Sequence, residues 1–370
     1  MRNILYIGAF ELPDKNAAAH RVINNAKCFN ELGVHTIFLD MQKGKIESEH
    51  ELLYNEIEVY HRKYPNTIFQ YFVYAFSIKK FKEIIKIHND IDTVIVYNFF
   101  SLTFLRILLY CKSHKIRIIS DCTEWYSSSI LNIVKRVDIL LRMHLLNKFC
   151  DGIIVISSYL ESFYQNLKTV KIPPLIDNSE DKWSKRNKCK ENTEIIFSYC
   201  GIPGKKERLD LFINVLSSDE FKNYNFRFNI VGITEVNFKE LYPNVKDLYF
   251  GDKIFFYGLV SHDKALEIMK NSNFGIILRE KTRTNNAGFP TKFVEYSSLG
   301  VPVIISCFSD VEDYITDTDI LINEVDFKQI TEALQNIFSN KMIKQKKDSN
   351  LFNYKNFTNN FKVFFDEIEN

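Results

Sequence analysis

The sequence has few of the residues that mark stapled, fibrous or disordered proteins. Its 370 residues include only 8 Pro, 12 Gly and 7 Cys. The cysteines stand at positions 28, 111, 122, 150, 189, 200 and 307; their number is odd and none form a CxxC pair. The sequence therefore indicates neither a disulfide framework nor a zinc site, and a reducing cytosol fits best.

Charge of one sign and long apolar runs are also missing. The 48 Lys and Arg residues against 46 Asp and Glu give a net charge of +2, too balanced to predict nucleic acid as a partner. The longest apolar stretch, Val94 to Tyr110, is interrupted by Asn98 and Arg106 and falls short of the about 20 residues that span a bilayer. The apolar run at residues 4–8 is too short for a signal peptide. We expect neither a transmembrane helix nor a signal peptide.

What is present is an ordinary globular composition with regular alternation. Hydrophobic residues make up 46% and charged residues 25%, and the length predicts two domains. Short apolar runs alternate with amphipathic helical patterns; they lie at residues 4–8, 36–40, 93–98, 116–120, 152–157, 194–200, 226–232, 253–258, 273–278, 301–306 and 319–323. Such alternation predicts an α/β fold with doubly wound parallel sheets.

The alternation is broken once, between residues 171 and 193. This segment contains Pro173-Pro174 and a polar run without an apolar face. We therefore predict an N-terminal domain at 1–175, a linker at 176–193 and a C-terminal domain at 194–352, with an aromatic helix at 353–370 that packs back on the N-terminal domain. The stretch from Lys341 to Lys347 is interpreted as a solvated helix end.

Two loops that follow predicted first strands are candidates for contact with a ligand. The loop after Gly8 is built of small residues and leads into a helix N-terminus, which either holds an anion or allows close packing. His20 and Arg21 at that helix start are either acceptor-side residues or surface residues. The loop from Gly201 to Lys206 combines two glycines with two lysines and predicts a diphosphate cradle, with an exposed basic turn as the alternative. It is not a P-loop, because the GK[ST] ending is missing.

A third loop runs from residue 279 to 296 through a Gly-Phe-Pro turn into a helix. That helix carries Lys292 and Glu295 on one face near its start. A carboxylate there accepts two hydroxyl hydrogen bonds, as a ribose offers. The alternative is a Lys/Glu pair on an exposed surface.

These motifs resemble those of the retaining glycosyltransferases of family 4. The pattern GFPxKxxEYxxxGxPVI is matched by residues 288–304, and the loop at 201–206 and the segment from 151 to 177 follow in the family's order. The resemblance implies the GT-B fold, with two Rossmann-like domains that face each other across a cleft. It also implies a nucleotide-sugar donor bound mainly by the C-terminal domain, an acceptor bound by the N-terminal domain, and no metal.

The resemblance assigns roles to individual donor-side residues. Glu295 matches the second Glu of the E-x7-E motif, which holds the nucleotide ribose. Ala287 occupies the place of the first Glu, which puts that contact in doubt and leaves Asn286 or Glu280 as substitutes. Lys206 or Lys205 resembles the lysine that neutralises the diphosphate, and Arg279 is a candidate for the missing Arg. The expected donor-binding set is Gly8, Gly201, Lys205, Lys206, Asn286, Gly288, Phe289, Lys292 and Glu295.

The N-terminal domain departs from the family pattern. Residues 119–126 contain no His where the family often has one. Asp121 and Glu124 are expected to bind sugar hydroxyls or to deprotonate an acceptor, and Trp125 and Tyr126 to stack on a sugar. Alternatively, Trp125 is core and Asp121 caps a helix. The expected catalytic set is Asp121, Glu124, Lys206 and Arg279, and the acceptor-side set is His20, Arg21, Trp125 and Tyr126.

We expect no cofactor and no metal. The Asp-x-Asp patterns at 90–92 and 317–319 are short, and neither stands at the carboxyl end of a predicted strand.

The implied function is transfer of a hexosyl group (EC 2.4), with retention, from a nucleotide sugar, UDP- in preference to GDP-. The acceptor is a glycan or lipid-linked glycan of bacterial surface or capsular polysaccharide synthesis. The alternatives are a nucleotide-sugar epimerase of the same fold and a non-catalytic scaffold. The expected location is the cytoplasm, with peripheral contact to the inner face of a membrane as an option. The aromatic and basic stretch Phe69 to Lys82 is interpreted as a core helix in preference to a segment that rests on a membrane surface.

Overall fold

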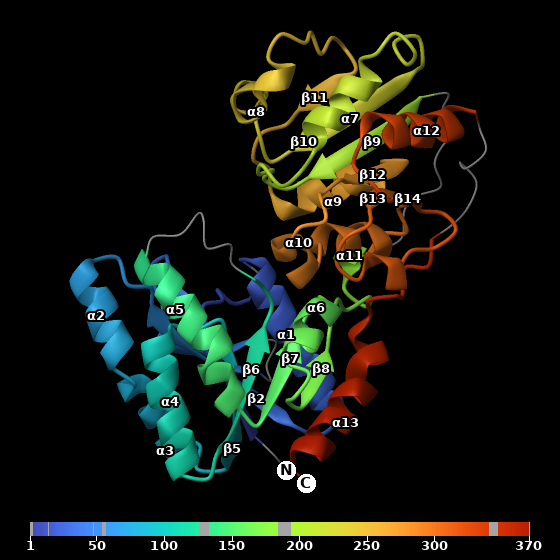
Figure 1. Ribbon diagram of the computed structural model, residues 1–370. Coiled ribbons are helices and arrows are strands. Elements are labelled where there is room, and N and C mark those ends of the chain that lie inside the picture. The colour runs from blue at the N-terminus through green and yellow to red at the C-terminus, as the bar shows by residue number, and fades with distance from the viewer. Residues whose placement is uncertain are drawn as a thin grey trace. The chain divides into compact units, whose positions relative to one another are not determined.

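The computed structural model describes residues 3–13, 15–46, 48–53, 57–125, 133–183, 194–339 and 347–369, apart from the side chains of Ile68 and Val134. The chain divides into two compact units (Figure 1). Unit 1 comprises Met1–Ile176 with Asn353–Asn370, and unit 2 comprises Asp177–Phe352. The chain therefore leaves unit 1, builds unit 2 and returns to unit 1 with its last segment.

Unit 1 is built on an eight-stranded sheet in the order β3-β4-β2-β1-β5-β6-β7-β8. All neighbours are parallel except β3 and β4, which form an antiparallel edge. The strands are β1 (Asn3–Gly8), β2 (His35–Gln42), β3 (His50–Leu53), β4 (Ile57–Lys63), β5 (Ile91–Tyr97), β6 (Arg117–Cys122), β7 (Gly152–Val155) and β8 (Thr169–Lys171). The alternation analysis did not predict β3, β4 and β8.

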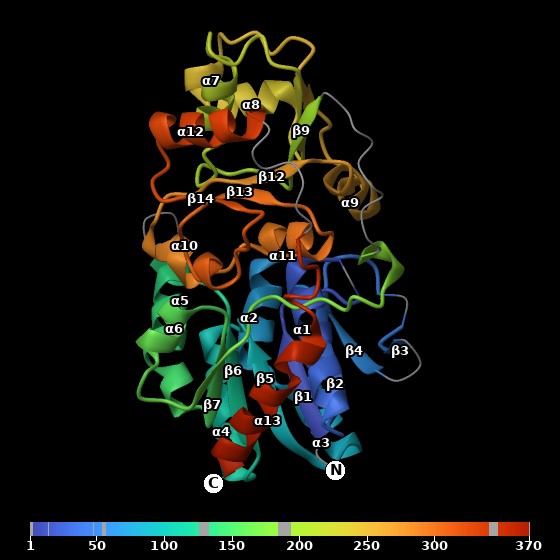
Figure 2. The same ribbon diagram turned by 90° about the vertical axis from the view of Figure 1, so that its right-hand side faces the viewer.

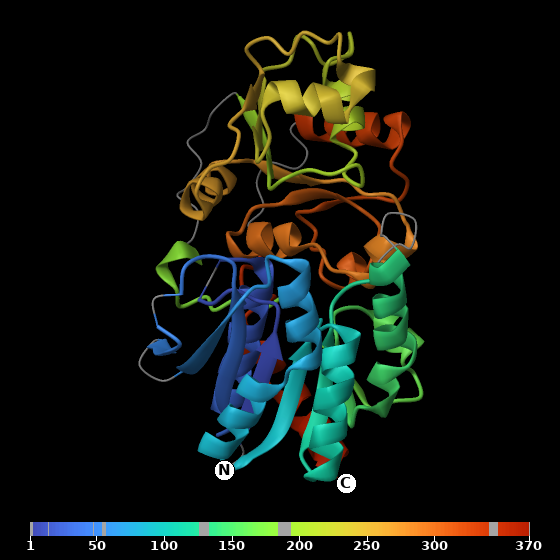
Figure 3. The ribbon, with the colours of Figure 1, turned by 90° about the vertical axis from the view of Figure 1, so that its left-hand side faces the viewer.

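Alternate residues of the central strand β1 enter two separate cores. Ile4 and Tyr6 point to one face, and Leu5 and Ile7 point to the other. The first face is covered by α1 (Ala17–Glu31) and α13 (Thr358–Glu369), which lie side by side in Figure 2. The other face carries α2 (Ile68–Phe76), α3 (Lys79–Ile87), α4 (Ser101–Ser113) and α5 (Ile133–His144) (Figure 3). Shorter helices complete the unit: η1 (Leu146–Phe149), α6 (Ser158–Phe163) and η5 (Tyr354–Phe357).

The packing of α13 explains a glycine of unit 1. A Cβ atom at Gly152 would lie 2.6 Å from the Phe364 ring. Phe361 of the same helix meets Phe29 of α1 edge to face, with ring centroids 4.8 Å apart. The C-terminal helix is therefore part of the core of unit 1.

Unit 2 contains a six-stranded parallel sheet in the order β11-β10-β9-β12-β13-β14. Its strands are β9 (Ile195–Cys200), β10 (Phe226–Val231), β11 (Ile254–Phe256), β12 (Phe274–Ile277), β13 (Val303–Ser306) and β14 (Ile320–Ile322). Its helices are η2 (Asp181–Trp183), α7 (Leu209–Leu216), α8 (Glu235–Leu241), η3 (Pro243–Val245), α9 (His262–Lys270), α10 (Arg283–Ala287), α11 (Thr291–Ser298), η4 (Val311–Asp313) and α12 (Phe327–Phe338). The two doubly wound sheets confirm the predicted α/β class.

Candidate functional site

Open α/β sheets bind ligands beyond the carboxyl ends of their strands, so these ends are described for each unit in turn. In unit 2 the loop after β9 begins at Gly201, whose φ is +137°. A Cβ at Gly232, after β10, would lie 2.4 Å from the Gly201 carbonyl oxygen. A Cβ at Gly201 would in turn lie 2.4 Å from Cε of Lys292. Two loops and one lysine therefore meet at a point that only glycine permits.

Lys292 stands at the start of α11, over the loop that follows β9. Its Nζ lies 5.0 Å from the centre of the Tyr199 ring. Burial, together with the positive charges of Arg279 and Lys206, lowers its pKa to about 8, against the opposing carboxylates of Glu207 and Glu295. The low pKa therefore reflects mainly the burial of this ammonium group, with a smaller part from the positive charges of Arg279 and Lys206.

Glu295 lies on α11 close to Lys292, as the spacing predicts. Its Oε1 is 3.4 Å from Nε2 of His262, the first residue of α9. The hydrogen bond to Glu295 is the main cause that raises the pKa of His262. Both side chains remain accessible, with exposed fractions of 25% for Glu295 and 43% for His262. The sequence analysis missed His262, because its only signal is its position at a helix start behind the Ser261 cap.

Arg279 is held by a carboxylate that the sequence analysis also missed. Its Nη2 lies 2.8 Å from Oε1 of buried Glu207. The other oxygen of Glu207 accepts the Gly204 amide at 2.8 Å, and the Tyr242 hydroxyl donates to the Glu207 carbonyl at 2.6 Å. Arg279 therefore braces the loop after β9 and its charge is compensated, while its buried Nε has no hydrogen-bond partner among the described residues.

The two loop lysines differ from Arg279 in exposure. Lys205 and Lys206 are both exposed on the loop after β9. The charge of Lys206 reaches Lys292, as the lowered pKa of Lys292 records. The structure thus brings Gly201, Lys206, Lys292 and Glu295 together at one edge of the sheet in unit 2.

In the Gly-Phe-Pro turn, the Phe289 side chain packs against other aromatic residues, whereas the sequence analysis expected it to contact the donor. Phe289 is buried in an aromatic cluster, with ring centroids 5.5 Å from Tyr314 and 5.8 Å from Phe352. Its side chain therefore stabilises the turn and is not free to bind a donor. The hydroxyl of Ser309 donates to the Gly288 carbonyl.

The residues around the missing first Glu are also engaged within unit 2. Asn286 Oδ1 accepts the Ser309 amide at 3.1 Å, so this side chain helps to fix the turn. Ala287 is fully buried. Glu280 forms an ion pair with Arg208 on the surface. Both candidate substitutes for the first Glu, Asn286 and Glu280, therefore have protein partners.

In unit 1, Gly8 has a packing reason of its own. A Cβ there would lie 2.7 Å from Cβ and 2.8 Å from the carbonyl oxygen of Tyr97, at the end of the neighbouring β5. The interpretation of a loop kept small for close packing therefore accounts for this glycine. Asn98, the next residue after β5, has a φ of 42° and donates to the Thr123 hydroxyl at 2.8 Å.

Asp121 and Arg21 form a buried ion pair. Asp121 has an exposed fraction of 0% and Arg21 of 3%, and Arg21 Nη2 lies 2.9 Å from Asp121 Oδ1. The Tyr6 hydroxyl also donates to Asp121, and Arg21 Nη1 donates to the Ile172 carbonyl at 2.9 Å. Burial, then the charge of Asp121, raises the pKa of Tyr6 well above its ordinary value. These contacts give Asp121 and Arg21 a structural role, and neither buried side chain is accessible to an acceptor.

The other residues expected on the acceptor side differ in how far they are buried. Glu124 is exposed, and His20 is half-buried in the first turn of α1. Trp125 is buried, and its ring meets Phe163 edge to face at 5.0 Å, so the alternative of a core residue describes it better than a stacking platform. Tyr126 lies outside the described residues.

A buried ion pair in unit 2 overturns one surface prediction. Nζ of Lys347 lies 2.7 Å from both carboxylate oxygens of Asp319, and both side chains have exposed fractions of 0%. Lys347 is therefore core and not part of a solvated helix end; residues 341–346 lie outside the described residues. The same pair accounts for Asp319, one of the two acids of the Asp-x-Asp pattern at 317–319. Within the described ranges, no group of three or more His, Cys, Asp or Glu side chains is placed to hold a metal ion.

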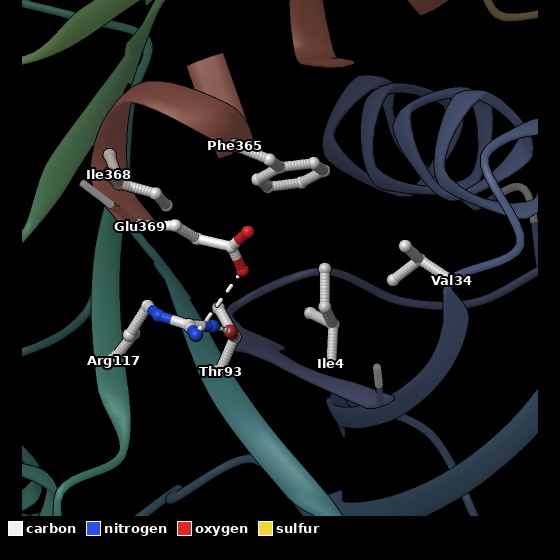
Figure 4. A pocket seen from close by; sticks show the side chains of 7 residues that line it. All are labelled: Ile4, Val34, Thr93, Arg117, Phe365, Ile368 and Glu369. Carbon is white, nitrogen blue, oxygen red and sulfur yellow. Dashed lines mark hydrogen bonds and ion pairs between the residues drawn. The ribbon is translucent and has the colours of Figure 1, made fainter. Parts of the chain in front are cut away.

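A small pocket of unit 1 lies at the amino ends of the strands, whereas this fold binds ligands at the carboxyl ends (Figure 4). It is lined by residues at the amino ends of strands, among them Ile4, Thr93 and Arg117. Arg117 also pairs with Glu369 at 3.2 Å. The volume of about 10 Å³ has room for about one water molecule.

Comparisons with known proteins fit this geometry. Residues 179–355 match the family model described as "Glycosyl transferases group 1". No curated protein matches the chain in sequence. Among solved structures, sucrose-phosphate synthase from Thermosynechococcus elongatus is similar, with 12% identity, a TM-score of 0.74, and coverage of 100% of this chain and 99% of that one.

Two other solved structures share the fold. HepE of Anabaena, in complex with UDP and glucose, has 13% identity and a TM-score of 0.68, with 99% of this chain and 100% of that chain covered. UDP-GlcNAc 2-epimerase from Methanocaldococcus jannaschii has 12% identity and a TM-score of 0.60, with 99% of each chain covered. The chain therefore has two Rossmann-like units of the GT-B type, and its second unit carries the glycosyl transferases group 1 region.

Proposed function

We propose that this GT-B chain is a glycosyltransferase that transfers a sugar from a nucleotide-sugar donor with retention of configuration. One observation carries the proposal. The carboxyl end of β9 in unit 2 gathers the exposed Lys206 and the crowded Lys292 beside the accessible carboxylate of Glu295. Cations for a diphosphate and a carboxylate for a ribose therefore stand at one strand end.

The cations meet the chemical demand of the reaction. Cleavage of a glycosyl phosphate bond leaves negative charge on the departing nucleoside diphosphate. Lys206 and Lys292 stand where they would stabilise that charge as it develops, and no metal is needed for this role. A bound diphosphate would add negative charge beside Lys292 and so offset the burial and the positive neighbours that lower its pKa.

Glu295 supplies the anionic part of the site. Its carboxylate would accept the two ribose hydroxyls, with His262 holding one oxygen. The solved complex of HepE with UDP and glucose supports a UDP-sugar in preference to a GDP-sugar as the donor.

The acceptor side of the proposal rests on fewer residues. Exposed Glu124 is the carboxylate that remains available to bind or deprotonate an acceptor in unit 1 once Asp121 is paired. We propose a glycan or lipid-linked glycan of surface polysaccharide synthesis as acceptor, used in the cytoplasm at the inner face of a membrane.

A panel of UDP-, GDP-, ADP- and dTDP-sugars tests the proposal. We expect one UDP-sugar at about 100 times its Kd to raise Tm by about 5 °C or more, with slow donor hydrolysis that EDTA does not change. Glu295→Ala should abolish the shift, and Glu267→Ala, an exposed carboxylate of α9, should keep it.

The other outcomes decide against the proposal. Absence of a thermal shift with every donor would reject the donor site. Formation of an epimeric sugar nucleotide without any acceptor would replace transfer by epimerisation. Donor binding without hydrolysis or transfer across a wide acceptor panel would indicate a non-catalytic scaffold.

A further inference from the structure

The helix layer of α2, α4 and α5 in unit 1 exposes large apolar side chains in unusual number. On α2, Phe69 is 75% and Phe72 is 61% exposed, and Val73 and Phe76 are exposed as well. The nine residues of α2 carry no charge, and Tyr74 is its buried anchor. The interpretation of this stretch as a core helix is therefore wrong for most of α2.

The apolar surface continues over the two neighbouring helices. α4 packs against both α2 and α5, and all three lie over the same face of the sheet (Figures 1 and 3). On α4 the exposed Leu102, Leu105 and Leu109 follow the spacing of one helix face. On α5, Val137 and Leu140 do the same. We call these side chains of α2, α4 and α5 the outer apolar face.

The opposite layer of unit 1 shows that such exposure is not general. Among the described residues of α1 and α13, Val363 is the one large apolar side chain that is exposed. Apolar patches of the size of the outer apolar face, bordered by polar residues, are typical of surfaces that bind a partner.

The charges that border this face are almost all positive. α3 carries Lys79, Lys80, Lys82 and Lys86 against a single acid, Glu83. α3 adjoins α4, since the rings of Phe81 and Tyr110 meet at 5.4 Å. On α4 and α5 the exposed cations are Arg106, Lys112, Lys135 and Arg136 against the single acid Asp138. Two of the lysines have acidic partners on other elements, Lys112 with Asp151 and Lys80 with Glu49, and the remaining excess is positive. This local excess contrasts with a net charge of only +2 for the whole chain.

We propose that the outer apolar face docks on an anionic lipid bilayer. Exposed Phe and Leu side chains bordered by Lys and Arg are the features of elements that lie in a membrane interface. None of the described helices is long and apolar enough to cross a membrane, so the contact is with the surface. A second copy is disfavoured as the occupant, because a symmetric contact would bring the same basic residues together.

Vesicle flotation of the full chain tests this proposal without donor or acceptor. We expect binding to vesicles of phosphatidylcholine with phosphatidylglycerol, at least tenfold weaker binding to phosphatidylcholine alone, and weakening by salt. Phe69→Ser with Phe72→Ser should lower the affinity at least tenfold. Val236→Ser with Leu259→Ser, two exposed apolar residues of unit 2, is the matched control and should leave it unchanged.

A charge variant separates apolar from electrostatic contributions. Arg106→Gln with Arg136→Gln should weaken binding to the anionic vesicles about tenfold or more and leave Tm unchanged. Equal binding of the wild-type protein and both pairs of variants in unit 1, or no binding at low salt, would overturn the proposal. A dimer that Phe69→Ser with Phe72→Ser dissociates, in a protein that does not bind vesicles, would replace the bilayer by a second copy. Because none of these readouts needs a sugar nucleotide, a failure here leaves the transfer reaction untouched.

Discussion

The two units differ in how the charged side chains at the carboxyl ends of their strands are buried and paired. In unit 1, Asp121 is matched by Arg21 and Tyr6, and all three are buried. In unit 2, Arg279 is paired with Glu207, whereas Lys206 is exposed and Lys292 is buried with a pKa lowered to about 8, mainly by burial. The first cluster is closed on itself, whereas the second includes the exposed Lys206 and the accessible carboxylate of Glu295, which a ligand can reach.

The difference teaches how to separate structural from ligand-binding charges. Both clusters stand where ligands bind in this fold, so position alone does not distinguish them. Burial and the number of protein partners do distinguish them. A buried carboxylate whose hydrogen-bond and ion-pair partners all belong to the protein is not available to bind a substrate.

The largest expected effect comes from breaking the closed cluster. Asp121→Ala leaves the Arg21 guanidinium buried without its carboxylate, so we expect unit 1 to lose about 3–5 kcal/mol of unfolding free energy, measured by urea denaturation. The double variant Arg21→Met with Asp121→Leu should recover most of the loss, because it removes both charges.

An exposed neighbour controls for this prediction. Glu124→Ala, three residues away, should change stability by less than about 0.5 kcal/mol. A loss below about 1 kcal/mol in Asp121→Ala, together with a fall in transfer rate while the protein stays folded, would return Asp121 to the catalytic set.

The open cluster is tested next, through its most exposed cation. Lys206→Ala should lower kcat about 10²-fold through lost stabilisation of the leaving diphosphate, with Tm unchanged. Lys205→Ala, on the same exposed loop, is the matched control. If Lys205→Ala carries the loss and Lys206→Ala does not, the roles of the two lysines are exchanged.

The alternation of apolar runs predicted the parallel cores of both units, but not the sheet edge at β3 and β4. Buried parallel strands appear as continuous apolar runs, whereas the edge strand His50–Leu53 has only four residues, two polar and two apolar, and gives no such run. The site could be predicted where spacing is local, as for Lys292 and Glu295 on one helix turn.

Contacts between distant residues could not be predicted in this way. Asp121 and Arg21 are 100 positions apart, Glu207 and Arg279 are 72 apart, and Asp319 and Lys347 are 28 apart. In each case the local pattern indicated a ligand contact, a loop or a solvated end, and a long-range partner decided the outcome. The burial of Lys347 shows this most clearly, because its local sequence is strongly polar.

The smallest expected effect is a pH dependence that reports on the open cluster. If protonated Lys292 binds the donor diphosphate, donor KM should rise roughly fourfold between pH 7 and 8.5 as an ammonium with a pKa of about 8 loses its proton. Lys292→Gln should show a high KM that is flat across this range, whereas Lys264→Gln, on the surface of α9, should keep the slope.

Stability should move in the opposite direction, which separates this effect from partial unfolding. The folded pKa of Lys292 is lower than the ordinary value of 10.5, so the unfolded chain binds more protons between about pH 8 and 10.5. The contribution of Lys292 to unfolding free energy therefore rises with pH over that range while donor affinity falls. If KM stays flat from pH 7 to 8.5 in the wild-type protein, Lys292 does not contact the diphosphate, and its low pKa is a consequence of burial without a role in donor binding.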